Sequence, residues 1–305
     1  VPPGGGHRAA AAAADDMLWL GPLCSTGGLA VGVAAAGLLG QCPASAAAAA
    51  FFVLSNLVPD KTSSQSVLGL FCGLLGAFLG YGLAAASYAM RALLLSTAWS
   101  RELTTPLRVP LFFVFVTIFH FAEFAFTAVF HPKDVEFRAF LLTPVPMGGY
   151  SIAMTAALAE FWLEDAVFSH TGSPLPASLS AVLLFVGAAL SLAGWLLRTA
   201  ALFTAQSNFT HLVAWHKAPQ HTLVRHGVYR LCRHPGYLGW FLWSVSTQLV
   251  LGNSFCLAAY AFVSWRFFAG RIPGEEAMLV SFFGEEYIQY AEEVPCGIPF
   301  ISTLP

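Results

Sequence analysis

The chain has 305 residues, of which 57% are hydrophobic and 10% are charged. In soluble domains about a quarter of the residues are charged, so this composition indicates an integral membrane protein. The formal net charge is -2 at pH 7. It supplies no general positive field, which argues against a nucleic acid as the partner.

Neither the N-terminus nor the cysteines indicate secretion or metal binding. Residues 1–16 lack the charged region, short apolar core and cleavage site of a signal peptide, so we expect a flexible or non-native terminus. The cysteines occur singly, without a CxxC pair, and most lie in or beside apolar runs. We expect them to be buried apolar side chains in preference to metal ligands or disulfides. They are Cys24, Cys42, Cys72, Cys232, Cys256 and Cys296.

Long apolar segments recur along the chain. A membrane-spanning helix needs roughly 17 to 25 mainly apolar residues. The third segment carries glycines four residues apart, a spacing that lets two helix backbones approach closely in lipid. We predict an all-α polytopic membrane protein with about eight transmembrane helices. They cover about 17–41, 43–59, 66–90, 109–130, 145–163, 178–203, 235–252 and 254–270.

Two of these segments carry ionisable residues at membrane depth, where charge is costly and normally faces a partner or a cavity. His120 and Glu123 lie three residues apart, and Glu160 and Glu164 lie four apart, so each pair shares a helix face. They either lock helices together or take a direct part in a site. Both interpretations place them inside the bundle.

Four histidines follow one another at a spacing of five residues: His211, His216, His221 and His226. On a helix, successive imidazoles would point about 140° apart and could not share a metal ion. We therefore predict no metal site here. The segment from 204 to 233 is expected to be a loop, with turns at Ala218-Pro219 and His226-Gly227.

The last two spans are joined by Gly252-Asn253, a tight turn signal, and should form an antiparallel helical hairpin. A hairpin returns the chain to the side of the membrane that it left. The loop before Pro235 and the segment after Gly270 therefore meet on one side. We expect Arg233 and His234 to lie close to Arg271 and Glu275.

The charge changes sign where these segments meet. No Asp or Glu occurs from 166 to 274, although Lys and Arg do. From Glu275 to Glu293 every charged residue is a Glu. We expect a region that binds an anion. Ile272-Pro273-Gly274 should break the helix, and a C-terminal amphipathic helix with acids in its first turn should begin at Glu275. Its apolar face would dock on the bundle or lie in the membrane interface.

Three motifs in this region carry a resemblance to a known family. They are RHPGYLGW at 233–240, WRFF with the later R, EE and FFGEEY over 265–287, and VPCGIPFI at 294–301. With them the chain resembles the isoprenylcysteine carboxyl methyltransferases, multispan enzymes of the endoplasmic reticulum. His120 and Glu123 also match, and the resemblance weakens in the first hundred residues. RHPxYxG alone is shared with phospholipid methyltransferases and sterol reductases, and the C-terminal motifs narrow the match.

The resemblance implies transfer of a methyl group from S-adenosylmethionine to the C-terminal carboxylate of a farnesylated or geranylgeranylated cysteine. The implied partners are prenylated CaaX proteins such as small GTPases, together with the lipid bilayer. By the same resemblance Arg271 binds the substrate carboxylate, and Glu275 orients Arg271 or meets the ammonium group of the cofactor. The implied cofactor residues are His221, Thr222, Leu223, Val224, Tyr229, His234, Pro235, Gly236 and Tyr237.

The chemistry suits these residues. A terminal carboxylate, with a pKa of about 3.5, is already ionised at neutral pH, so that no general base is required. The site must mainly hold the carboxylate and the methyl donor in line. An arginine fork binds a carboxylate at two points and does not deprotonate.

Other interpretations are open at the level of residues and of function. Arg233 could be a juxtamembrane anchor, Pro235 a first-turn proline and Tyr237 part of an aromatic belt. The matching C-terminal motifs on the same side favour the site. The alternative functions are a phosphatidylethanolamine-type N-methyltransferase, a sterol reductase and a transporter. No basic cluster for a nicotinamide cofactor's extra phosphate and no inverted repeat occurs.

The expected organisation is a single integral membrane methyltransferase domain over 1–305. Six N-terminal spans would cover 17–203, and the catalytic C-terminal region would cover 204–305. The basic residues near 225–233 and Arg271 place the cofactor site on the cytosolic side by the positive-inside rule.

Overall fold

The computed structural model describes residues 63–96, 100–142, 149–211, 216–217, 219 and 221–301. The predicted spans 17–41 and 43–59, and the first sixteen residues, lie outside this part. All regular structure within the described ranges is helical. The α-helices are α3 (Gln65–Leu95), α4 (Arg101–Phe130), α5 (Gly149–Thr171), α6 (Ala177–Ala205), α7 (Pro235–Leu251), α8 (Phe255–Phe283) and α9 (Glu285–Glu293). Short 3-10 turns lie at Pro132–Asp134, Phe137–Phe140, Gln206–Asn208 and Gly227–Arg230.

The prediction of an all-α membrane protein is confirmed. By length and composition, three helices in the described ranges could cross a membrane: Gln65–Leu95, Arg101–Phe130 and Ala177–Asn208. The six predicted spans that fall mainly on described residues each overlap one helix, from α3 to α8. The chain is therefore a multi-pass membrane protein.

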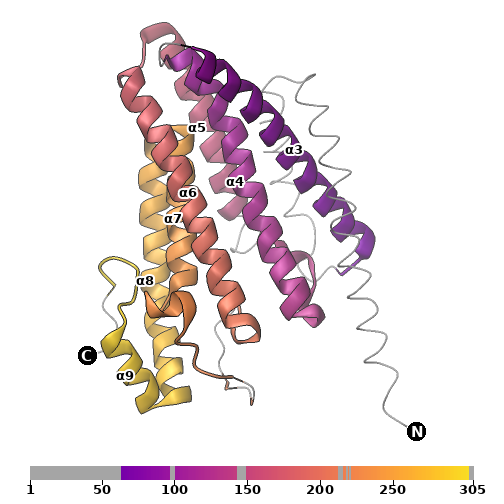
Figure 1. The fold of residues 1–305 in the computed structure, drawn as a ribbon, viewed down its shortest axis with the longest axis vertical. Helices are drawn as coiled ribbons and strands as arrows, with labels where there is room; N and C mark the ends of the chain where they lie inside the picture. Colours follow the sequence, from indigo (N-terminus) through magenta and orange to yellow (C-terminus); the bar gives the residue numbers. More distant parts are fainter. Residues whose placement is uncertain are drawn as a thin grey trace. The chain divides into compact units, whose positions relative to one another are not determined.

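The described residues divide into two compact units, the first formed by the chain up to 188 together with 247–256, and the second by 189–246 together with the chain from 257. In the first unit α3 packs along α4 (Figure 1). A methyl group on Gly82 would lie 2.8 Å from the Pro110 carbonyl oxygen, so the backbones touch at this glycine. Helix α3 therefore packs closely at Gly82, which is not one of the glycines spaced four residues apart (Gly69/Gly73 and Gly76/Gly80).

The intramembrane His120 and Glu123 are both fully buried in the first unit. The His120 ring bonds to the Phe140 carbonyl at 2.7 Å through Nδ1 and to the Tyr150 hydroxyl through Nε2. His120 thus ties α4 to the 3-10 turn that follows it and to α5. These contacts are those of a residue that locks helices together.

Two charged side chains cap the turn between α7 and α8. The Glu160 carboxylate accepts the backbone N–H groups of Phe255 and Cys256 at 2.6 and 2.7 Å, at the start of α8. Arg108 donates to the Val250 carbonyl at 2.9 Å, at the end of α7. A carboxylate at a helix N-terminus and a cation at a C-terminus each complement the helix dipole. The hairpin turn is thereby fixed at both helix ends.

The predicted helix break at Ile272-Pro273-Gly274 is wrong, because α8 continues through Pro273 to Phe283. An interior proline costs about 3 kcal/mol through its missing N–H and its clash with the preceding turn. Here Ile272 and Glu276 are both buried, with 0% and 1% of their surfaces exposed, and their packing holds the helix on both sides of the proline. The chain turns instead at Gly284, whose φ of 58° suits glycine. The next helix is α9, which begins at Glu285, ten residues after the predicted start of the last helix.

The second unit holds α6 and α7 at very close range. A methyl group built on Gly194 would lie 2.5 Å from the Trp243 nitrogen, and one on Gly239 would lie 2.6 Å from the Arg198 nitrogen. Both distances are shorter than any real contact, so each position requires glycine. This close contact positions the start of α7, where the RHP motif lies.

We expect Gly194→Leu to separate α6 from α7 and to destabilise the protein by about 3 kcal/mol or more, because the added atoms would meet backbone that cannot yield. Gly274→Ala is the matched control, since Gly274 is an exposed helical glycine with open space around it. It should be neutral or stabilising by about 0.5–1 kcal/mol. Thermal unfolding in one detergent measures both, and an unchanged midpoint for Gly194→Leu would contradict the close contact.

Candidate functional site

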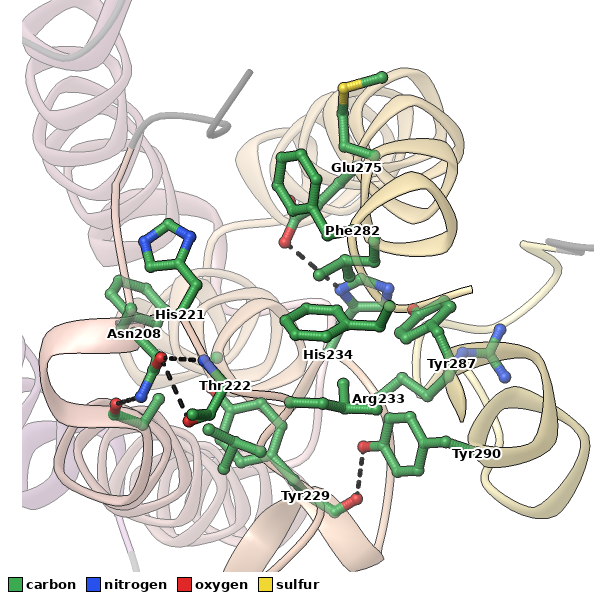
Figure 2. A pocket seen from close by; sticks show the side chains of 18 of the residues that line it. Asn208, His221, Thr222, Tyr229, Arg233, His234, Glu275, Phe282, Tyr287 and Tyr290 are labelled. Carbon is green, nitrogen blue, oxygen red and sulfur yellow. Dashed lines mark hydrogen bonds and ion pairs between the residues drawn. The ribbon is translucent and has the colours of Figure 1, made fainter. Parts of the chain in front are cut away.

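A pocket in the second unit lies between the loop after α6, the start of α7 and the end of α8 with α9 (Figure 2). The wall from α8 is mostly apolar, and the opposite wall carries polar groups. The lining residues are Ala205, Asn208, Phe209, Thr210, His221, Thr222, Leu223, Val224, Tyr229, Arg233, His234, Pro235, Gly236, Tyr237, Glu275, Met278, Leu279, Phe282, Phe283, Tyr287 and Tyr290.

All nine residues predicted to bind the cofactor line this one pocket, and so does Glu275. Arg271 does not line it. It lies one helical turn before Glu275 on α8 and contacts the pocket through Tyr237. The structure therefore brings every predicted site residue into a single region.

The loop that forms one pocket wall has no regular secondary structure at 221–225. Side chains supply some of the hydrogen bonds that its backbone makes. The Asn208 side-chain oxygen accepts the Thr222 backbone N–H at 2.9 Å. The Tyr290 hydroxyl donates to the Tyr229 carbonyl at 2.7 Å and so joins the loop to α9 (Figure 2). Burial raises the pKa of the Tyr229 phenol, which therefore stays neutral. The polar wall is held in place by residues that the motifs did not single out.

Tyr237 links the two residues predicted to be catalytic. Its hydroxyl donates to the Glu275 carboxylate and accepts from Arg271 Nε at 2.7 Å. Arg271 Nε itself lies 3.8 Å from Glu275 Oε2. The Tyr237 ring stacks with the His234 ring, with centroids 5.5 Å apart, and with the Phe268 ring, with centroids 4.8 Å apart. The hydroxyl position is therefore fixed by packing as well as by hydrogen bonds.

A second acid, Glu276, is almost fully buried. Its Oε1 accepts from Arg233 Nε at 2.8 Å and contacts His234 Nε2 at 3.0 Å. Arg233 Nη1 also donates to the Ala291 and Val294 carbonyls at 2.8 and 2.5 Å. The predicted meeting of the RHP loop with α8 is thus observed, but the partner of Arg233 is Glu276.

Sequence reasoning assigned no separate role to Glu276, Asn208 or Tyr290. The role of Glu276 could have been predicted from charge alone. The RHP motif is basic and faces two consecutive acids, so each acid is expected to pair with a different cation. Asn208 and Tyr290 carried no such signal, since their contacts are with backbone groups of the loop.

Three possible metal ligands lie together in this part of the chain. The ligand atoms of His234, Glu276 and Cys296 are within 4.8 Å of one another, and all three residues are buried. The Arg233 guanidinium, however, bonds the Glu276 carboxylate at 2.8 Å. A metal ion at this position would face a permanent positive charge. The arrangement therefore favours an ion pair between Arg233 and Glu276 over a bound metal ion.

Two arginine–glutamate pairs near the pocket should differ in their effect on stability. The Arg233–Glu276 pair is 5% and 2% exposed, whereas Arg225 and Glu286, 3.2 Å apart, are each 50% exposed. Removing Arg233 leaves a buried carboxylate without its cation, which typically costs about 3–5 kcal/mol. Removing Arg225 breaks a solvent-screened pair worth at most about 1 kcal/mol.

We therefore expect Arg233→Ala to lower the thermal midpoint markedly and Arg225→Ala to leave it nearly unchanged, with both proteins measured in the same detergent. Equal shifts of the thermal midpoint for the two variants would show that the buried pair stabilises the protein no more than the exposed pair does.

The sequence profile of the isoprenylcysteine carboxyl methyltransferase (ICMT) family matches residues 186–281. The mouse protein-S-isoprenylcysteine O-methyltransferase is 42% identical over 189 residues, which are 62% of this chain and 64% of the mouse protein. A probable protein-S-isoprenylcysteine O-methyltransferase of Oryza sativa subsp. indica is 39% identical over 193 residues, 63% of this chain and 96% of the rice protein.

A solved structure of the eukaryotic intramembrane Ras methyltransferase ICMT is also similar, with a TM-score of 0.71 and 30% identity. The match covers 95% of this chain and 99% of the solved one. The match to the mouse protein, by contrast, covers 64% of the mouse protein's length, which is less than two thirds. The rice protein and the solved structure are matched over nearly their whole lengths at 30% identity or more. The chain belongs to the isoprenylcysteine carboxyl methyltransferase family.

Proposed function

We propose that this protein is an S-adenosylmethionine-dependent protein-S-isoprenylcysteine O-methyltransferase. It would esterify the C-terminal carboxylate of a farnesylated or geranylgeranylated cysteine in CaaX-processed proteins, including small GTPases. The observation that carries the proposal is the gathering of all nine predicted cofactor residues and Glu275 around one pocket, with Arg271 bonded to its wall.

The pocket residues fit a methyl donor that has an aromatic base and a charged amino-acid end. Aromatic side chains (Phe209, Phe282 and Phe283) and Met278 offer apolar contacts. His234 and Glu275 offer polar groups. When bound, S-adenosylmethionine supplies an electrophilic methyl group on a sulfonium. The residues of this chain need only bind it, orient it and exclude water.

Arg271 is proposed to hold the substrate carboxylate. Its Nε donates to Tyr237 and its Nη2 to the His211 carbonyl at 2.6 Å. Within the described ranges no acceptor meets Nη1, so the edge formed by Nη1 and Nη2 can bind a carboxylate at two points. The contacts to Tyr237 and His211 fix the plane of the guanidinium and thereby the line of attack. Since the carboxylate is already ionised, no proton has to be removed.

Glu275 is proposed to set the position of this guanidinium through Tyr237 and to face the methyl donor. The i, i+4 spacing places Glu275 on the same face of α8 as Arg271. The carboxylate also keeps an acidic group at the pocket wall, where a ligand ammonium could bind.

The wider organisation belongs to the same proposal. The chain would form a single methyltransferase domain of about eight spans, with α7 and α8 as the final hairpin and α9 as the C-terminal amphipathic helix. It would lie in the endoplasmic reticulum membrane with the pocket facing the cytosol, and it would need no metal. The comparisons give no support to the alternatives, a phosphatidylethanolamine-type N-methyltransferase, a sterol reductase or a transporter.

The function is tested by methyl transfer from S-adenosylmethionine to S-farnesylcysteine and to free cysteine in the same detergent. We expect the prenylated compound alone to react, because each buried methylene contributes about 0.8 kcal/mol and a fifteen-carbon tail dominates binding. S-adenosylmethionine, but not NADPH, should raise the thermal midpoint. Comparable turnover of free cysteine would refute the substrate class, and stabilisation by NADPH alone would refute the reaction.

Arg271→Lys tests the two-point grip. Lysine keeps the charge but loses the planar fork, so it should be nearly as damaging as Arg271→Ala. Losing one such contact should cost about 2–4 kcal/mol in the transition state, roughly a thirtyfold to thousandfold fall in kcat/KM. Arg266→Lys is the control, because Arg266 is exposed on the same helix, whereas Arg271 bonds to Tyr237 of the pocket wall. An Arg271→Lys enzyme with near wild-type kcat/KM would remove Arg271 from the proposed mechanism.

A further inference from the structure

Two consecutive acids on α8, Glu275 and Glu276, bond to different partners. Glu275 is 26% exposed at the pocket wall and bonds to Tyr237. Glu276 is 1% exposed and bonds to Arg233 and His234. Adjacent helical residues point about 100° apart. His234 lies between the two carboxylates, with Nε2 at 3.0 Å from Glu276 and Nδ1 at 4.0 Å from Glu275. Figure 2 shows His234 and Glu275 at the pocket.

The donor and acceptor chemistry of this group decides which nitrogen of His234 carries the proton. An ionised carboxylate only accepts hydrogen bonds, and Glu276 is held ionised by the Arg233 guanidinium at 2.8 Å. His234 Nε2 must therefore donate its N–H to Glu276. In a neutral imidazole the other nitrogen then carries a lone pair. That nitrogen, Nδ1, is the one that faces Glu275 on the pocket side.

We propose that Glu276 is a positioning residue that fixes His234 as the Nε2-protonated tautomer, so that His234 Nδ1 and the Glu275 carboxylate form a pair of acceptors for a ligand ammonium group. The 4.0 Å between them is too long for a direct hydrogen bond and leaves both atoms able to accept. The identity of the ligand rests on the proposed function, because the amino-acid end of the methyl donor carries such an ammonium.

The competing explanation is purely structural. Arg233 also donates to the carbonyls of Ala291 and Val294, and the Arg233 N–H bonds the Pro295 carbonyl at 2.9 Å. The Arg233–Glu276 pair could therefore act only by fastening the C-terminal tail. A useful experiment must separate loss of the tail's attachment from loss of the acceptor pair.

Two ligands make this separation. S-adenosylhomocysteine carries the ammonium, and 5′-methylthioadenosine has the same nucleoside end without it. By calorimetric titration, Glu276→Gln should raise the dissociation constant of S-adenosylhomocysteine about tenfold and that of methylthioadenosine less than about twofold. Trp265→Phe is the control, since it removes the bond from the indole N–H to the Pro299 carbonyl near the chain's end and keeps an aromatic ring against the apolar cluster. It should change neither constant. An equal loss for both ligands, or no loss for either, would overturn the proposal.

The wild-type protein gives a second test that needs no ligand and no variant. With ¹⁵N-labelled histidine, and His234→Gln to assign the signal, the spectrum should show His234 protonated at Nε2 alone. Protonation at Nδ1, alone or with Nε2, would overturn the proposal even if Glu276→Gln failed to fold. A requirement for a metal ion, seen as loss of S-adenosylhomocysteine binding in EDTA and recovery with Zn²⁺, would overturn it too. If the wild type binds neither nucleoside ligand, the proposed function fails and the spectrum still decides the tautomer.

Discussion

The burial of the Arg233–Glu276 ion pair is the constraint on which the second unit depends. Removing two charges from water costs several kcal/mol per ion, and the pair is favourable only if the remaining donors and acceptors are also satisfied. Arg233 donates further to the carbonyls of Ala291 in α9 and of Val294 just after it, and Glu276 Oε1 contacts His234 as well as Arg233. Three segments that are far apart in sequence, the RHP loop, α8 and the tail, must therefore come together before either charge can be buried.

This requirement also explains the course of α8. Glu276 can reach Arg233 only if the helix keeps its phase across Pro273, because a break there would rotate the acids that follow. The helix tolerates the proline, and Phe268 and Ile272 pack in one buried cluster with Cys296 and Ile298 of the tail. Local propensity favoured a break at the proline, and the packing of distant residues outweighed it.

The difference between predicted and observed features follows from the same contrast. The helices, the hairpin at Gly252-Asn253 and the meeting of Arg233 with α8 depend on apolar length and chain direction, which can be read from the sequence. The pairing of Arg233 with Glu276, and the bonds from Asn208 and Tyr290 to loop backbone, depend on side-chain geometry over long separations. No periodicity encodes such contacts. The Pro273 error arose because a local rule was applied where tertiary packing decides.

On the proposed function, the stack of His234, Tyr237 and Phe268 becomes the physical connection between the two substrates. Tyr237 holds Arg271 on the side of the carboxylate, and its ring lies parallel to His234 on the side of the methyl donor, with an interplanar angle of 3°. A rotation of the Tyr237 ring would disturb both contacts together. Because Glu276 fixes His234 and Phe268 also stacks on Tyr237, the ring has little room to rotate. In-line methyl transfer needs this kind of rigidity, since its rate depends on alignment more than on any acid or base.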